Sequence, residues 1–165
     1  MWHHLLHENS IFLHLEAPNA EAALAEMIAL LQEPGFHSKQ KSRLLEFLLQ
    51  RERFGTTALG DGIALPHCLF PEIESSFGCL GISRKGISFP SLGGEPVYAL
   101  FMSVFPENGT AHAERFMILR EAEIFLRDPF VRQRLKISES SQEAYELILR
   151  ESAHLNSSFR FAGNQ

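Results

Sequence analysis

The residues best suited to chemistry lie in one stretch, residues 50–68, in which Pro66 is followed directly by His67. Pro66 has no backbone N–H and a restricted φ, so it leaves the hydrogen-bond ladder of a strand and gives the next residue a defined direction. A neutral imidazole offers one ring nitrogen as a nucleophile while a hydrogen bond to the other nitrogen sets its tautomer. We therefore expect His67 to be presented at a strand end as a group that can accept a phosphoryl group.

Candidate groups for stabilising a transferred phosphoryl group precede His67 in the same stretch. The transition state of such a transfer is mostly metaphosphate-like, so a protein contributes position, positive charge and hydrogen-bond donors. Arg51, Thr56 and Thr57 are the candidate phosphate-binding residues, together with backbone N–H groups near Gly60 and Gly62. Two alternatives are structural: Arg51 also suits a helix C-terminus, and Thr57 also suits the backbone groups of a turn.

Two helices are expected before this stretch. Asn19 is a suitable N-cap for a helix with apolar residues at helical spacing, which ends before Pro34. Ser38 is a suitable cap for a second helix, in which four leucines form one stripe and which ends at Gly55.

Short apolar segments after Gly55 predict a sheet. Residues 58–65, 77–84 and 97–105 have the character of strands, and residues 87–89 form a candidate short edge strand. The segment 97–105 is almost wholly apolar, which is typical of a strand covered on both faces. The sequence thus predicts an α/β fold: a single layered domain with a central mixed β-sheet flanked by helices on both faces.

Helical periodicity returns in the last third of the chain. It covers residues 111–127, and a final helix follows Ser140, which has capping-box spacing with Glu143. Residues 156–165 have little periodicity and are expected to fray. We therefore expect one domain over residues 1–155 and a short C-terminal tail.

An ordered motif in this stretch carries a family resemblance. Arg51-Glu52 ends a helix, Gly55-Thr56-Thr57 follows, and the segment Gly60-Asp-Gly-Ile-Ala-Leu-Pro-His67 completes the motif. It resembles enzyme IIA proteins of the bacterial phosphotransferase system, of the fructose, mannitol and nitrogen-regulatory (PtsN-like) type, and the order of elements over about residues 11–152 is similar. The resemblance implies that His67 is the phosphorylated residue. It also implies an HPr-type phosphocarrier protein as donor, and an enzyme IIB or regulated proteins as downstream partners.

A second active-site histidine, usual in that family at the start of the helix after the buried strand, has no direct match. Counting back from Asp128 places Arg115 at this position, and His112 lies three residues earlier on the same helical face. Arg115 can hold a phosphate through two parallel hydrogen bonds but does not readily exchange protons. Both residues remain candidates for assisting His67.

Three functions follow from the resemblance. The first is a phosphohistidine carrier, a phosphotransferase component of nitrogen-regulatory type, favoured because no membrane segment, enzyme IIB or carrier module accompanies the domain. The second is an enzyme IIA fold that binds regulated proteins with weak or no phosphotransfer, which the arginine at position 115 favours. The third is a sugar-specific, fructose or mannitol enzyme IIA.

Composition excludes several other classes. The chain has 165 residues and a formal charge of −5, which argues against general binding to nucleic acid. No apolar run approaches the roughly 20 residues that span a bilayer, so no membrane insertion is expected. Only two cysteines are present, both in apolar surroundings, which fits a reducing cytoplasm.

No cofactor is expected. The three early histidines fit an irregular amphipathic end as well as a metal site. His14 and His37 have no partner at metal-ligand spacing, and neither HExxH nor paired CxxC motifs occur. The glycines at 60 and 62 lack the third glycine and the lysine-bearing helix of a nucleotide loop. Two further readings are weaker: Cys68 as a thiol nucleophile has no orienting partner, and a hydrolase using His67 as general base has no evident nucleophile.

Overall fold

The computed structural model describes residues 1–34, 36–91, 93–107 and 111–162, without the side chains of residues 111, 112 and 155–162. In chain order the elements are η1 (Trp2–Leu5), η2 (Glu8–Ser10), β1 (Ile11–Phe12), α1 (Ala20–Leu30), α2 (Ser38–Arg53), β2 (Ala58–Gly60), β3 (Ile63–Ala64), β4 (His67–Leu69), β5 (Phe77–Ile87), β6 (Val97–Phe105), α3 (Ala111–Arg127), α4 (Pro129–Ile137) and α5 (Ser141–Ala162).

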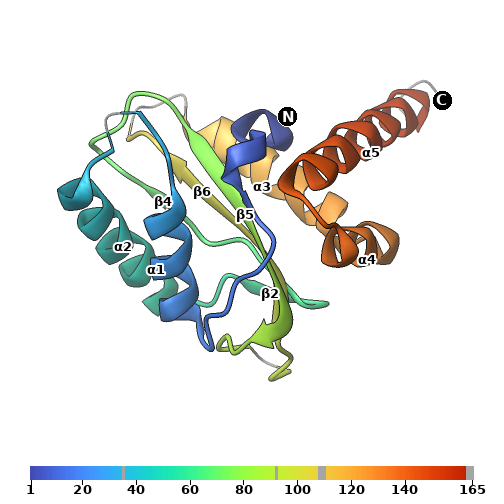
Figure 1. Ribbon diagram of the computed structural model, residues 1–165. Helices are drawn as coiled ribbons and strands as arrows, with labels where there is room; N and C mark the ends of the chain where they lie inside the picture. Colours follow the sequence, from blue (N-terminus) through green and yellow to red (C-terminus); the bar gives the residue numbers. More distant parts are fainter. Residues whose placement is uncertain (35, 92, 108–110, 163–165) are drawn as a thin grey trace.

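The centre of the molecule is a mixed sheet (Figure 1). Its strand order is β1-β5-β6-β3-β2, with β4 also paired to β6. The long β5 and β6 are antiparallel, whereas β3 and β4 both run parallel to β6 at different points along it. The predicted fold class is confirmed.

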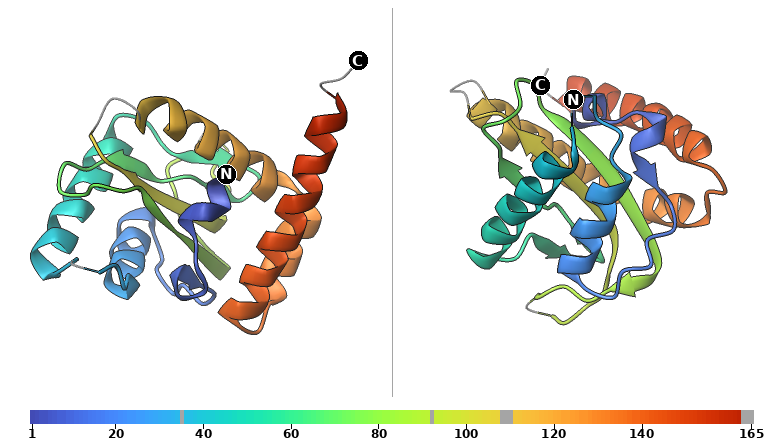
Figure 2. Two further views of the ribbon diagram at one scale, coloured as in Figure 1. Left: turned by 90° about the horizontal axis from the view of Figure 1, so that it is seen from above. Right: turned by 60° about the vertical axis from the view of Figure 1, so that its left-hand side comes forward.

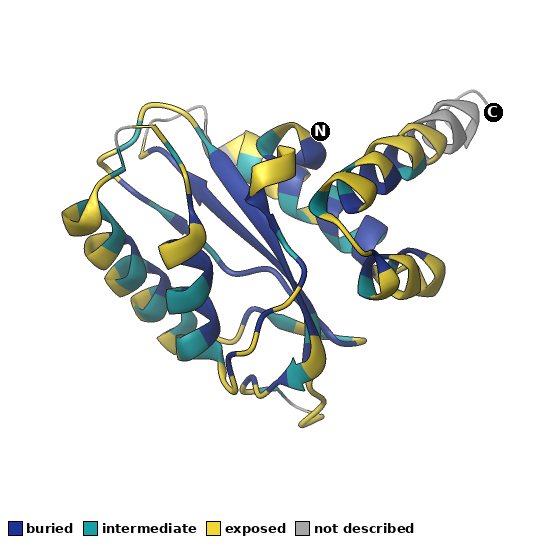
Figure 3. Cartoon of the chain, in the orientation of Figure 1, coloured by how far each residue is buried: buried dark blue, intermediate teal, exposed yellow. Residues whose placement is uncertain are grey.

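Helices cover both faces of this sheet. Helices α1 and α2 lie on one side and α3, α4 and α5 on the other (Figures 1 and 2). Residues of β6 alternate between the two cores: Phe101 packs in the α3–α5 layer, whereas Met102 packs in the α1–α2 layer. Both side chains are fully buried, which explains why this strand has no polar alternation. Figure 3 shows the buried strands between helices whose outer faces are exposed.

The helix predictions are mostly confirmed. Asn19 caps α1 by accepting a hydrogen bond from the Ala22 N–H at 2.9 Å. Helix α2 begins at Ser38, but its N-cap is His37 rather than Ser38. Helix α4 was not predicted, although Asp128 caps it and Pro129 occupies its first turn, both of which are common helix-start signals.

The strand predicted over residues 58–65 is wrong, because the chain folds there into an antiparallel hairpin of β2 and β3. Its turn is Gly60-Asp61-Gly62, with φ values of 82°, 54° and 74°. Three successive left-handed residues reverse the chain, and glycine at two of them removes the steric cost. The predicted edge strand at 87–89 is also wrong, because Ile87 is the last residue of the long β5.

The C-terminal boundary remains a prediction. Helix α5 extends to Ala162 in the structure, and residues 163–165 lie outside the description.

Candidate functional site

His67 is the first residue of β4 and lies next to Ser103 of β6 in parallel register. Its Nδ1 atom is 2.8 Å from the carbonyl oxygen of Leu65. A carbonyl oxygen only accepts hydrogen bonds, so Nδ1 carries the proton and donates it. The lone pair is therefore on Nε2, which is the nitrogen available as a nucleophile.

The half-buried His67 lines a cavity of about 450 Å³. The remaining lining residues come from the end of α2, the segment that follows it, and α3: Arg51, Thr56, Thr57, Leu59, Leu65, Phe116, Leu119, Arg120 and Glu123. The predicted phosphate-binding residues Arg51, Thr56 and Thr57 thus lie with His67 around one cavity.

The surroundings of His67 lower its pKa below the usual value for histidine. Burial is the main cause, since it disfavours the charged ring, and the charges of Arg51 and Arg115 act in the same direction. The Leu65 carbonyl and the Glu52 carboxylate oppose this shift. The ring is therefore neutral near pH 7, which is the form a nucleophile needs.

Glu52 connects the end of α2 to the segment that carries His67. Its carboxylate accepts hydrogen bonds from the Thr57 N–H at 2.8 Å and from the Thr57 hydroxyl at 2.7 Å. The Thr57 carbonyl in turn accepts the Leu65 N–H at 3.0 Å, and the Leu65 carbonyl holds the ring of His67. A continuous chain of hydrogen bonds therefore runs from Glu52 to His67.

The three predicted phosphate ligands differ in what they have free to offer. Arg51 uses Nη1 to donate to the Gly55 carbonyl at 3.0 Å, which leaves its other N–H groups. The Thr57 hydroxyl donates to Glu52, so its proton is engaged. Thr56 is exposed, and its hydroxyl accepts the Ala58 N–H at 3.2 Å while its own proton has no acceptor among the described residues.

Arg115 lies in the first part of α3 and is half-buried, with its guanidinium carbon 5.1 Å from the centre of the Phe116 ring. Its charge acts on His67, although it is not among the residues lining the described cavity. The side chain of His112 lies outside the described part of the structure. The assistance of His67 by Arg115 or His112 therefore stays a prediction.

The sequence did not identify the face of α3 that closes the cavity. Phe116, Leu119, Arg120 and Glu123 recur at spacings of three and four residues and therefore lie on one face of α3; this spacing is the sequence signal for that face. Arg120 is exposed, and its guanidinium has no hydrogen-bond or ion-pair partner within the described part of the chain. It adds an uncommitted cation to the cavity wall.

Comparison with known proteins decides the family. The family model for the phosphoenolpyruvate-dependent sugar phosphotransferase system, EIIA 2, matches residues 4–151. The chain belongs to this family. It is 32% identical to a nitrogen regulatory protein of Bradyrhizobium diazoefficiens over 144 residues, which are 87% of this chain and 92% of that protein.

The chain is also similar to other proteins. A fructose-specific EIIABC component of Bacillus subtilis is 27% identical over 87% of this chain, and the match covers 22% of that longer protein. Among solved structures, the nitrogen regulatory protein IIA-Ntr of Neisseria meningitidis has a TM-score of 0.78 and 25% identity, with 88% of this chain and 97% of that chain covered. IIA mannitol of Escherichia coli has a TM-score of 0.68 and 21% identity, covering 87% and 98%, and shares the fold.

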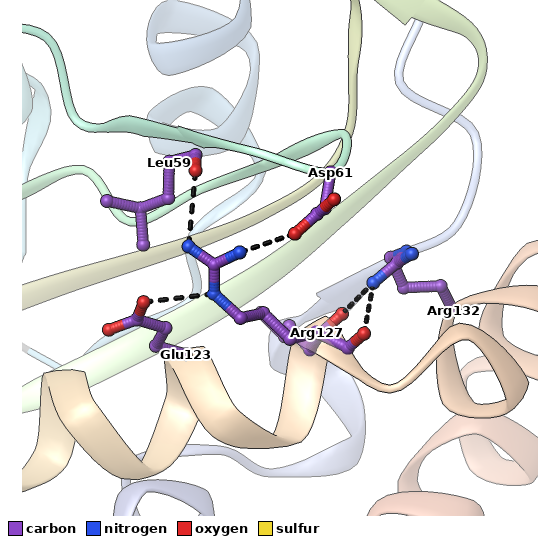
Figure 4. A network of polar contacts seen from close by, with 6 residues as sticks. Leu59, Asp61, Glu123, Arg127 and Arg132 are labelled. Carbon is purple, nitrogen blue, oxygen red and sulfur yellow. Dashed lines mark hydrogen bonds and ion pairs between the residues drawn. The ribbon is translucent and has the colours of Figure 1, made fainter.

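In this enzyme IIA domain, Arg127 fixes the β2–β3 hairpin against α3 (Figure 4). Its guanidinium forms an ion pair with Asp61 at the turn and donates to the Leu59 carbonyl at 3.2 Å. It also bonds Glu123, which lines the cavity, at 3.0 Å. The hairpin and the helix are thereby joined beside the His67 cavity.

The thiol alternative does not fit this enzyme IIA domain. Cys68 is buried among residues that pack on the α1–α2 side of the sheet, whereas the His67 ring lines a cavity bounded by α3. Burial raises the pKa of the Cys68 thiol to about 12, so the reactive thiolate is scarce at neutral pH.

The enzyme IIA domain shows neither a membrane span nor a metal cluster in its described part. None of its described helices is both long and apolar enough to cross a bilayer. Within the same residues, no three histidine, cysteine or acidic side chains gather where they could hold a metal ion.

Proposed function

We propose that this chain is a phosphohistidine carrier of the phosphoenolpyruvate-dependent phosphotransferase system, of nitrogen-regulatory type. It accepts a phosphoryl group from an HPr-type phosphocarrier on His67, then passes it to an enzyme IIB or reports it to regulated proteins. One observation carries the proposal: the bond from Nδ1 to Leu65 leaves Nε2 as the nucleophile at a cavity that also holds Arg51 and Arg120.

The transfer step balances with the groups present. The Nε2 lone pair forms a bond to phosphorus while the bond from phosphorus to the donor's histidine nitrogen breaks, and that nitrogen keeps the electron pair. The proton on Nδ1 stays in place, and its bond to the Leu65 carbonyl strengthens as the ring gains positive charge. Arg51, Arg115 and Arg120 supply positive charge for the phosphoryl oxygens.

The nitrogen-regulatory assignment is supported by relatives of that name. The Bradyrhizobium protein matches over nearly the whole of both chains, whereas the fructose-specific relative of Bacillus subtilis is a longer protein of which this domain matches a part. A sugar-specific role is the alternative within the same chemistry, and transfer to a fructose- or mannitol-type enzyme IIB distinguishes it.

The test is incubation with phosphoenolpyruvate, enzyme I and an HPr-type carrier, followed by measurement of acid-labile phosphate on the protein. We expect labelling of the unmodified protein and of His14→Ala, which removes an exposed histidine away from the cavity, and no labelling of His67→Ala. Full labelling of His67→Ala would falsify the assignment.

A second candidate, an enzyme IIA fold that binds regulated proteins with little or no transfer, is favoured by one observation. Arg115 occupies the position that the family resemblance assigns to the second histidine. The same assay separates the two: absence of labelling with both cognate and heterologous donors supports the binding domain. If labelling occurs, Arg115→Ala is expected to slow it or to make the phosphoryl group more labile.

A further inference from the structure

A second cavity lies between α4 and the sheet. It has a volume of about 270 Å³, and its lining residues are Ile82, Tyr98, Ala99, Pro129, Arg132, Gln133 and Lys136. We propose that this cavity binds a small phosphate monoester, a site that is independent of the phosphoryl transfer at His67.

The two cavities are separate places on the same side of the sheet. They share no lining residue. In β6, the residue beside His67 is Ser103, whereas Ala99 borders the second cavity. Four residues of strand correspond to about 13 Å, so a ligand in one cavity does not occupy the other.

The charge around the second cavity is uniformly positive. Arg132 and Lys136 are four residues apart on α4 and therefore project from the same face of the helix. No carboxylate lines the described cavity, and neither cation forms an ion pair among the described residues. Helix α4 contains a third cation, Arg134, and no acidic residue, although the whole chain has a charge of −5. Unpaired like charges on one helix face are unfavourable unless an anion lies between them.

The groups that would hold the anion are already fixed in place. Arg132 donates from Nη1 to the carbonyls of Leu126 at 2.9 Å and Arg127 at 2.6 Å (Figure 4), which leaves its remaining N–H groups for a ligand. Lys136 lies over the ring of Tyr98 with Nζ 4.4 Å from the ring centre. A site whose donors are held before binding loses less conformational entropy when the ligand enters.

The ring of Tyr98 packs against the backbone at Gly62 and at Gly86. A Cβ added at Gly62 would lie 2.9 Å from Tyr98 Cδ2, and one added at Gly86 would lie 3.0 Å from its Cε1. Glycine at both positions thus lets the ring approach the backbone closely. On the sheet side of the cavity, Tyr98 is therefore closely packed against both glycines.

The lining specifies the class of ligand. A planar guanidinium with free N–H groups and an ammonium group suit the oxygens of a phosphate. Ile82, Ala99 and Pro129 supply an apolar surface, and a volume of about 270 Å³ exceeds what a phosphate ion alone would fill. The combination fits a phosphate group attached to a short carbon skeleton.

The test is an NMR titration of the whole protein with phenyl phosphate and with inorganic phosphate, at constant ionic strength set by chloride. We expect saturable shifts of the backbone amides of Tyr98, Gln133 and Lys136, with phenyl phosphate binding more tightly than inorganic phosphate. Resolving the shifts by residue separates this cavity from any binding of phosphate near His67.

Matched variants then identify the cations. Lys136→Gln is expected to weaken phenyl phosphate binding at these amides about tenfold. Arg134→Gln removes the same charge from an exposed position on the same helix that does not line the cavity, and should leave the affinity nearly unchanged. Shifts confined to the surroundings of His67, equal affinity for the two phosphates, or equal weakening by both variants would each overturn the proposal.

Discussion

Replacing Glu52 by alanine tests the chain of hydrogen bonds that supports His67. The carboxylate of Glu52 accepts two short bonds, at 2.8 and 2.7 Å, from the N–H and the hydroxyl of Thr57. Thr57 is only 4% exposed, so both groups lose their acceptor in a place that water reaches poorly. Each unsatisfied buried group costs about 1–3 kcal/mol, and partial access of water at Glu52 reduces the sum to about 2–4 kcal/mol.

Urea denaturation measures this loss as a change in the free energy of unfolding. For a domain of this size, each kcal/mol also lowers Tm by about 2–4 °C. Glu52→Gln keeps one acceptor oxygen and should fall between Glu52→Ala and the unmodified protein. Glu46→Ala is the matched control, because Glu46 is exposed on the same helix, and its change should stay within about 0.5 kcal/mol.

Replacing Glu52 by alanine should also affect the imidazole of His67. Thr57 and Leu65 are joined by a backbone bond of 3.0 Å, and Leu65 holds Nδ1 of His67. We therefore expect Glu52→Ala to weaken the preference for the tautomer protonated at Nδ1, which ring ¹⁵N chemical shifts report. If Glu52→Ala and Glu46→Ala lose the same stability and leave the tautomer unchanged, this reasoning is refuted.

Two further predictions concern pH and packing. Because the folded protein lowers the pKa of His67, the unfolded state binds more protons below about pH 6.5. The contribution of a neutral His67 to stability is therefore complete above that pH and is lost as pH falls towards the folded pKa. Unfolding free energies from about pH 8 to about pH 5 should decline less for His67→Ala than for the unmodified protein, and parallel curves would contradict the shift. Gly81→Ala should destabilise the fold by about 1–3 kcal/mol, since the new Cβ would overlap Leu15 Cδ1 and lie 2.9 Å from Met27 Sδ. In Gly93→Ala the new Cβ would lie 3.8 Å from Glu95 Cγ, an ordinary contact distance, and a thermal melt that separates the two variants checks the packing argument.

Much of the layered fold follows from local patterns along the sequence. The apolar stripe of a helix and the unbroken apolar run of residues 97–105 each require a covering layer, and these requirements together define helices on both faces of a sheet. Asn19 marks a helix start through a bond between neighbours in sequence, so it needs no knowledge of the rest of the molecule. Such local rules predict elements well.

The errors arose where a short turn interrupts an apolar run. The segment 58–65 is apolar on both sides of Gly60-Asp61-Gly62, so its composition resembles that of one strand. The dipeptide Asp-Gly is a hairpin-turn signal, and giving it more weight would have divided the segment into two strands. The pairing of β3 and β4 with different parts of β6 depends on contacts more than 30 residues apart, as between His67 and Ser103. No local pattern contains that information.

Some residues of the candidate site could be predicted from the sequence and others could not. His67, Arg51 and Thr56 lie in one motif, so their proximity could be expected from the sequence. Arg120 and Glu123 reach the cavity only because α3 crosses the sheet at this point. Their roles depend on tertiary packing, which the motif does not encode.

The charge near His67 is positive, although the net charge of the chain is negative. The chain is acidic overall. Arg51 and Arg120 nevertheless line the cavity with His67, and Arg51 and Arg115 lower the pKa of its imidazole. A guanidinium stays charged on both sides of neutral pH, whereas a second histidine would change its charge near neutrality. Arg51 and Arg115 therefore favour the neutral, nucleophilic ring of His67, and in the proposed transfer they and Arg120 would attract the anionic phosphoryl group. If the proposed transfer occurs here, its rate should change less between about pH 6 and about pH 8 than that of an enzyme IIA whose assisting residue is a histidine.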